Sequence, residues 1–424
     1  MAEESKEYMP KLWFKSSQPW RAYPLGDIFE FKKNATNSRE DLSASGNIHY
    51  IHYGDIHTKY HGFVDFTKNV IPFLKDNVSV KSDFICDGDI IIADASEDEE
   101  GIGKAIEVKN LSKENKAISG LHTILLRPHK RIFSPFFASY LFSSVHTKKQ
   151  FIKIATGIKV YSLAKSALKN VELVVPTIAE QQKIADCLSS LDELIQAHEQ
   201  KRDALMEHKK GLMQRLFPAE GETTPRWRFP EFRNGGDWVE TQIKQLGKII
   251  TGKTPSTNNP AFWEGEYIWV TPTDMDSHKN IYFSERTITG EWLKESSILP
   301  ENSVLITCIA SIGKNCILKK KGFCNQQINA IIPDFEKYNS DFIYYIFDIK
   351  KYILINNSGI SATRILSKSK FEELMFPFPT LPEQQKIADC LSSLDSSIEA
   401  QEAKIASLRE HKQGLMQRLF PQSL

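Results

Sequence analysis

Hydrophobic residues in two stretches of the chain recur at alternating intervals of four and three, which is the heptad spacing of helices that pack side by side. The predicted seam of the first stretch consists of Ile184, Leu188, Leu191, Ile195, Leu205 and Leu212. The predicted seam of the second consists of Ile387, Leu391, Leu394, Ile398, Ile405, Leu408 and Leu415. A period of 3.5 residues predicts a partner helix packed along a left-handed supercoil.

The two stretches are copies of one sequence. Residues 176–218 and 379–421 are identical at 31 of 43 positions, with a constant offset of 203. Each copy opens with a Thr-x-x-Glu capping box and ends at Phe-Pro, where proline stops a helix. We therefore predict two helices of roughly 37 residues and about 55 Å each. Because both lie in one chain and match in length, they are expected to pair with each other, antiparallel, under a pseudo-two-fold axis.

The rest of the chain repeats an order of short elements with little sequence identity. Runs 48–56 and 267–275 carry strand-like patterns, and 86–96 and 301–311 each read as a turn followed by a buried strand. The fold class is therefore α+β, with two similar mixed α/β modules, each followed by a long helix. The predicted boundaries are an arm at 1–19, module 1 at 20–175, helix 176–218, a linker at 219–237, module 2 at 238–378 and helix 379–424.

Composition is ordinary for a soluble globular protein of two or three domains. Hydrophobic residues make up 41% and charged residues 25% of the 424 positions, and no apolar run is long enough for a membrane span. The six cysteines lack a CxxC pairing and are expected to be reduced thiols. A cytoplasmic location follows as an expectation.

Basic residues are concentrated, although the net charge is only +1. Residues 115–171 contain ten lysines and arginines and no Asp or Glu, and residues 349–371 contain five and again no acid. Two basic tracts at matching module positions favour a polyanion that is contacted twice. The alternative is a solvated charged face, which usually intersperses both signs.

Two segments match catalytic motifs, but neither match supports a catalytic site. Residues 247–254 match the phosphate-loop pattern GxxxxGK[ST], but Pro255 opposes the helix that must follow directly. Asp94, Glu107 and Lys109 match a nuclease-like pattern that arises often by chance. The histidines and cysteines show no metal-ligand spacing. We therefore predict no catalytic residues, no metal and no cofactor in this chain.

The repeated EQQKIADCLSSLD and GLMQRLFP segments, with RWRFPEF before the second module, resemble the specificity subunits of type I restriction–modification enzymes. The resemblance covers essentially the whole chain. It implies a non-enzymatic subunit with two target-recognition domains, each reading one half of a bipartite, asymmetric DNA sequence. It also implies that the repeat helices set the half-site spacing and dock two methylation subunits. Motor and nuclease subunits would complete the complex, with S-adenosylmethionine, ATP and Mg²⁺ on those partners.

Candidate DNA-binding residues are chosen by position and chemistry within each module. In module 1 they are Lys32, Lys33, Tyr53, Lys104, Lys159, Tyr161 and Lys165. In module 2 they are Lys253, Thr254, Thr271, Thr273, Lys314, Arg364 and Lys368. Two other classes stay open: a coiled-coil adaptor without sequence-specific DNA binding, and a nuclease or ATPase.

Overall fold

The structure is a computed structural model that describes residues 9–14, 18–60, 62–129, 132–275, 279–359 and 363–421. The chain divides into two compact units. Unit 1 contains Met1–His198 with Lys404–Leu424, and unit 2 contains Glu199–Ala403. Each unit thus holds one module, the first half of the helix that follows it, and the last part of the other long helix.

Unit 1 is built on a five-stranded mixed sheet in the order β2-β11-β7-β9-β5, in which β5 runs parallel to β9 and the other neighbours are antiparallel. A smaller sheet has the order β10-β4-β6-β3, and β1 pairs with β13 and β12 with β8. The strands are β1 Arg21–Pro24, β2 Phe29–Lys32, β3 Leu42–Ser43, β4 Ile48–Ile51, β5 Phe63–Asp65, β6 Phe73–Leu74, β7 Ile90–Ala93, β8 Ala95–Ser96, β9 Ala105–Lys109, β10 Lys116–Ser119, β11 Thr123–Pro128, β12 Tyr161–Ser162 and β13 Glu172–Val175. The helices of this module are α1 Leu25–Ile28, α2 Tyr53–Thr58, α3 Phe137–Ser143, α4 Val145–Ile154 and α5 Lys165–Leu168.

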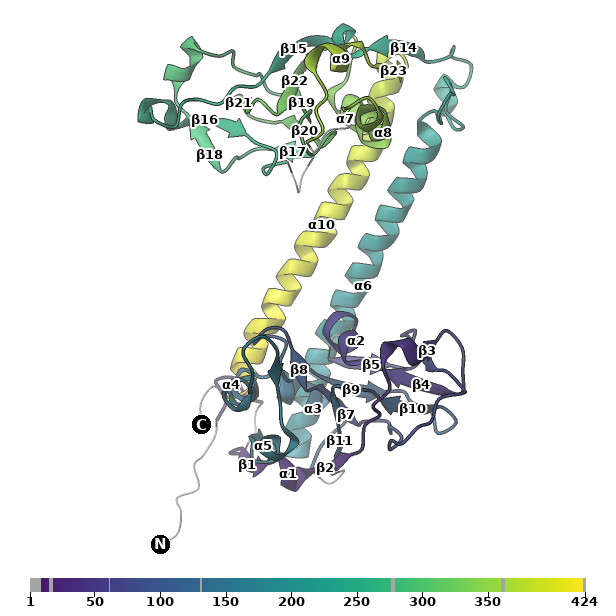
Figure 1. Cartoon of the computed structure of the whole chain (residues 1–424), viewed down its shortest axis with the longest axis vertical. Coiled ribbons are helices and arrows are strands. Elements are labelled where there is room, and N and C mark those ends of the chain that lie inside the picture. The colour runs from purple at the N-terminus through teal and green to yellow at the C-terminus, as the bar shows by residue number, and fades with distance from the viewer. Residues whose placement is uncertain are drawn as a thin grey trace. The chain divides into compact units, whose positions relative to one another are not determined.

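Unit 2 repeats this frame, since its five-stranded sheet has the order β15-β22-β19-β20-β17 with the same pattern of directions. Figure 1 shows this sheet beside α7 and α8. The strands are β14 Val239–Gln242, β15 Gly247–Thr251, β16 Trp263–Val270, β17 Asn280–Ile281, β18 Arg286–Ile288, β19 Val304–Thr307, β20 Asn315–Leu318, β21 Gly322–Cys324, β22 Ile328–Pro333 and β23 Met375–Phe378. The helices are α7 Ser340–Ile349, α8 Lys351–Asn356 and α9 Lys368–Glu373. The prediction of two mixed α/β modules of one fold is confirmed.

The repeated stretches form two helices of 39 residues each, α6 Ile178–Leu216 and α10 Leu381–Leu419. In unit 1 they pair antiparallel. Ile184 and Leu188 share a core cluster with Leu415 and Leu419, while Ile195 clusters with Ile405 and Leu408. Residue numbers therefore rise along α6 as they fall along α10, as the two-helix prediction requires. No helix among the described residues has the length and hydropathy of a membrane span.

Each long helix ends by inserting a phenylalanine into a module core. In unit 1 the Phe420 ring lies 5.8 Å from those of Trp20 and Phe137, and in unit 2 the Phe217 ring lies 6.0 Å from Trp238 and 5.3 Å from Phe342. The helix that leaves module 1 thus ends in the core of module 2, and the helix that leaves module 2 ends in that of module 1. The repeated Leu-Phe-Pro ending is therefore a structural anchor.

The N-terminal arm and the linker dock on the helices in equivalent ways. The Leu12 N–H donates to the Arg418 carbonyl at 2.8 Å, and the Trp227 N–H donates to Arg215 at 3.0 Å, positions that the repeat offset relates. Phe229, in the RWRFPEF segment, packs against the unit 2 core. The arm, where it is described, is thus attached to α10.

Candidate nucleic-acid interface

Aromatic and imidazole rings gather in module 1 where β4 ends and α2 begins. The Tyr53 ring lies 4.7 Å from that of His52 and 5.3 Å from that of His122, which precedes β11. Arg39 approaches the same group, with its Nη2 3.4 Å from His52 Nδ1 and 3.2 Å from Asp55 Oδ1. Burial and the Arg39 charge lower the pKa of His52, which favours the neutral imidazole, a ring with both a donor and an acceptor.

Lys104, at the start of β9, lies beside this ring cluster and supports it. Its Nζ donates to the His57 carbonyl at 2.7 Å, and burial lowers its pKa. His122 lies 3.4 Å from the Asp94 carboxylate, whose pKa burial raises. Tyr161 pairs with Ser96 of β8, two residues past Asp94. The candidates Tyr53, Lys104 and Tyr161 therefore lie together at one edge of module 1.

The remaining candidates of module 1 flank that edge. Lys159 is exposed at the tip of a hairpin, and the Tyr161 hydroxyl donates to Glu99 at 3.3 Å. Lys165 Nζ donates to the Asn34 side chain at 3.0 Å, which places it near exposed Lys33. Lys32 differs, since it forms an ion pair with Glu30 of its own strand.

The candidates of module 2 form two groups. In one, Thr271 Oγ1 donates to Asp274 at 2.6 Å and lies 3.5 Å from Thr273 Oγ1, while Thr254 donates to Gln326. Lys253 Nζ donates to the Glu295 carbonyl at 3.0 Å.

The second group lies where β19 ends, where β20 begins and at the start of α9. The Lys314 N–H donates to Thr307 Oγ1 at 3.0 Å, and the Arg364 carbonyl accepts from Ala310 at 2.9 Å. Lys368 Nζ donates to the Ile249 carbonyl at 3.2 Å and lies 3.6 Å from Glu372.

Strand register matches three candidate pairs between the modules. Lys104 and Lys314 precede equivalent strands, while Tyr161 and Arg364 directly precede Ser162 and Ile365, which form equivalent backbone pairs with Ala95 and Ile309. The third pair, Lys165 and Lys368, is related by the 203-residue offset. Two pairs keep lysine and one changes from tyrosine to arginine.

Sequence reasoning missed an arginine stacked on tryptophan. The Arg286 guanidinium carbon lies 3.5 Å from the centre of the Trp263 ring and 5.7 Å from that of Trp269. Nothing local marks Arg286, because the stack joins β18 to β16. Sequence reasoning also passed over His52 and His57, although the run HYIHYGDIH (49–57) was a visible signal.

The residues of the discarded catalytic motifs serve structural contacts. Glu107 is buried, and its carboxyl oxygens accept from the N–H groups of Phe136 at 2.6 Å and Ser139 at 3.2 Å. Lys109 stacks on Phe136, at 4.6 Å. The phosphate-loop match begins inside strand β15 with no helix directly after it. Among the described residues, no cluster of His, Cys, Asp and Glu could hold a metal ion.

The predicted seam residues serve several contacts. Ile184, Leu188 and Leu415 face the core of unit 1, and Leu212, Ile387 and Leu391 face that of unit 2. Leu191, Ile195, Ile405 and Leu408 form a small cluster between the helices in unit 1. Leu205 and Leu394 are half-buried, and Ile398 lines a pocket.

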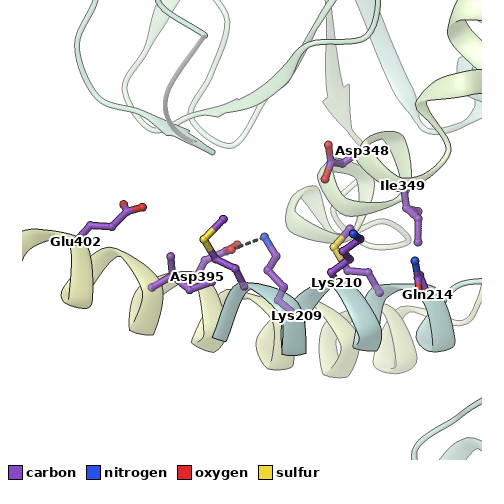
Figure 2. A pocket seen from close by; sticks show the side chains of 10 residues that line it. Lys209, Lys210, Gln214, Asp348, Ile349, Asp395 and Glu402 are labelled. Carbon is purple, nitrogen blue, oxygen red and sulfur yellow. Dashed lines mark hydrogen bonds and ion pairs between the residues drawn. The ribbon is translucent and has the colours of Figure 1, made fainter. Parts of the chain in front are cut away.

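That pocket opens beside the helix pair of unit 2 and has a volume of about 440 Å³. Figure 2 shows Lys209 pointing to Asp395 across it, and these two form an ion pair. Its lining is formed by Met206, Lys209, Lys210, Met213, Gln214, Asp348, Ile349, Asp395, Ile398 and Glu402. The equivalent pair in unit 1 is Lys412 with Asp192. Arg202 replaces Ile405 in the repeat and binds Asp203 instead of filling the seam, so the apolar cluster of unit 1 has no counterpart here.

Comparison with known proteins identifies a protein family whose model matches this chain. The model of the type I restriction modification DNA specificity domain matches residues 17–207 and again 235–410. The putative type I restriction enzyme MjaX specificity subunit of Methanocaldococcus jannaschii is 26% identical over 408 residues, covering 95% of this chain and 93% of that protein. The MjaIX specificity subunit of the same organism is 38% identical over 169 residues, which is 38% of this chain and 39% of the relative.

Solved structures share the fold. The S subunit of a type I restriction–modification system from M. genitalium aligns with a TM-score of 0.62 at 17% identity, covering 97% of this chain and 99% of that one. A chain from a structural study of complex assembly and conformational transition of the type I R-M system aligns with a TM-score of 0.54 at 16% identity, covering 96% and 98%.

Proposed function

We infer the function from one premise: this chain belongs to the type I restriction–modification DNA specificity family, whose model matches both modules. The chain is a DNA specificity subunit of a type I restriction–modification system. A subunit of this kind works in an assembly with other subunits.

Each module is proposed to read one half of a bipartite, asymmetric DNA target. The observation that carries this is the register between modules. Lysine is kept at 104 and 314 and at 165 and 368, where positive charge suits the phosphate backbone. Tyr161 is replaced by Arg364, and base edges of different chemistry need different side chains.

The two long helices are proposed to set the half-site spacing and to dock two methylation subunits. Their continuity over 39 residues each makes them stiff spacers, and the two copies are identical at 31 of 43 positions, as docking of two like partners favours. Motor and nuclease subunits would join these. S-adenosylmethionine, ATP and Mg²⁺ are assigned to the partners, and this chain is assigned no catalytic step.

Methylome sequencing tests the proposal. Cells carrying the complete operon are compared with cells lacking only this gene, and with cells in which the gene is restored. We expect a split motif whose modified adenines vanish on deletion and return on complementation. An unchanged methylome, in cells with active methylation subunits, would instead support the coiled-coil adaptor.

A second experiment addresses the enzyme alternative. In the nuclease or ATPase interpretation, Lys253→Ala abolishes a catalytic activity while DNA binding stays intact. We expect Lys253→Ala to change DNA binding only. Lys253 follows strand β15 and does not lie at a helix N-terminus, and its Nζ donates to the Glu295 carbonyl.

A further inference from the structure

A hairpin in module 1 exposes two aliphatic side chains that the fold does not use. Thr156 and Ser162 exchange backbone hydrogen bonds of 3.0 and 2.8 Å, which close the hairpin. Between them Ile158 is 95% exposed and Val160 is 53% exposed. Two neighbouring exposed aliphatic side chains at the tip of one ordered hairpin form a candidate contact surface.

The conformation of the tip is specified by the sequence. Gly157 has a φ of +116°, and a Cβ there would lie 2.0 Å from the carbonyl oxygen of Val160. Only glycine allows this turn. The base of the hairpin is also fixed, because Tyr161 pairs with Ser96 and the buried Leu163 donates its N–H to the Asp94 carbonyl at 2.8 Å.

The charge around the tip indicates what it contacts. Exposed lysines at 149, 153 and 165 flank the hairpin in sequence and Lys159 lies at its tip, while the acidic residues 97–100 lie beside its base, where Tyr161 contacts Glu99. The lysine at the tip itself attracts the phosphates of DNA. The major groove of DNA admits a two-stranded ribbon, and its one apolar base-edge group is the C5-methyl of thymine.

We propose that Ile158 and Val160 contact thymine methyl groups in the major groove, so that module 1 requires A·T pairs under the hairpin tip. The proposal rests on the proposed function, since it needs module 1 to read DNA. Aliphatic side chains offer no hydrogen bond, so they select a base by its methyl group alone. Tyr161, next to the tip, can supply a polar contact to a neighbouring base.

Deoxyuridine substitution tests the proposal directly, because deoxyuridine lacks only the methyl group of thymine. The complex with its methylation subunits is titrated with duplexes of the target mapped by methylome sequencing, in which each thymine is replaced in turn. We expect one or two replacements to weaken binding by about fourfold each, the value of one methyl group removed from water. In Ile158→Ser or Val160→Ser, the thymine and deoxyuridine duplexes should bind equally at the affected position.

Val70→Ser is the matched control. Val70 is 93% exposed in the same module and follows β5. Strand β5 pairs with the end of β9, at Lys109, whereas Lys104 beside the candidate edge precedes the start of β9. This variant should keep the preference for thymine.

Three outcomes would overturn the inference. One is wild-type binding to the mapped target that is indifferent to every deoxyuridine. A second is an Ile158→Ser variant that weakens binding but keeps the full preference for thymine. The third is that Ile158→Ser or Val160→Ser no longer assembles with the methylation subunits, which would show that the tip contacts a protein. A wild-type complex that does not prefer its mapped target over a scrambled duplex would instead refute the proposed function.

Discussion

A lysine can bind DNA without reading its sequence, and exposed Lys159 is a clear case for that role. We expect Lys159→Ala to weaken binding equally for all sequences and to lower the slope of log affinity against log salt by about 1, the mark of one lost phosphate contact. Lys368→Ala should have a smaller effect, because Glu372 at 3.6 Å already offsets part of its charge. Titrations over a range of salt concentrations measure both, and an unchanged slope in Lys159→Ala would exclude the phosphate contact.

Glu107 makes the stability of unit 1 depend on pH. Burial raises the pKa of Glu107 to about 8, above its usual 4.5. The folded state therefore holds a proton that the unfolded state releases, so stability falls as pH rises from about 4.5 to about 8, by roughly 4–5 kcal/mol in total. Glu107→Gln should remove this loss, which thermal unfolding between pH 5 and 9 would detect. Glu97→Gln, in an exposed loop of the same module, is the control and should leave the pH dependence unchanged.

At the scale of elements, the linker is fastened by a buried ion pair. The Arg228 guanidinium donates to both oxygens of Glu383, at 2.8 and 2.5 Å, and Glu383 is 1% exposed. Arg228→Met would leave the buried Glu383 carboxylate without its ion-pair partner near the start of α10. We expect the free energy of unfolding to fall by about 3–5 kcal/mol. Chemical unfolding measures it, with the exposed Arg226→Met as control and Arg228→Met/Glu383→Gln as a partial rescue. A loss no larger than that of Arg226→Met would show that the pair contributes little.

Sequence reasoning predicted the secondary-structure elements better than the tertiary contacts that they make. The 3.5-residue period identified α6 and α10 because it follows from backbone geometry, but it could not show that Ile184 and Ile387 also pack into module cores. The capping-box pattern pointed to Glu383, whose carboxylate instead binds Arg228, 155 residues away in sequence. The Arg286–Trp263 stack was missed for the same reason. Each depends on tertiary contacts that local patterns do not encode.

At the scale of the whole molecule, the proposed spacing role makes a quantitative prediction. Inserting one heptad into each long helix, after His198 and after Ala403, keeps the hydrophobic period in both. Seven residues add about 10.5 Å of helix, close to three base pairs at 3.4 Å each. We expect methylome sequencing to return the same two half-sites with a spacer about three base pairs longer.

The matched control places seven residues in the linker 219–237, which should leave the spacer unchanged because the linker is not part of either helix. A heptad in one helix alone shifts α6 against α10 and should misplace pairs such as Asp192 with Lys412, so methylation should fall sharply. If the doubly extended chain still directs methylation with the original spacer, the helices do not measure the distance between half-sites. The modules would then have to find their half-sites by some means other than helix length.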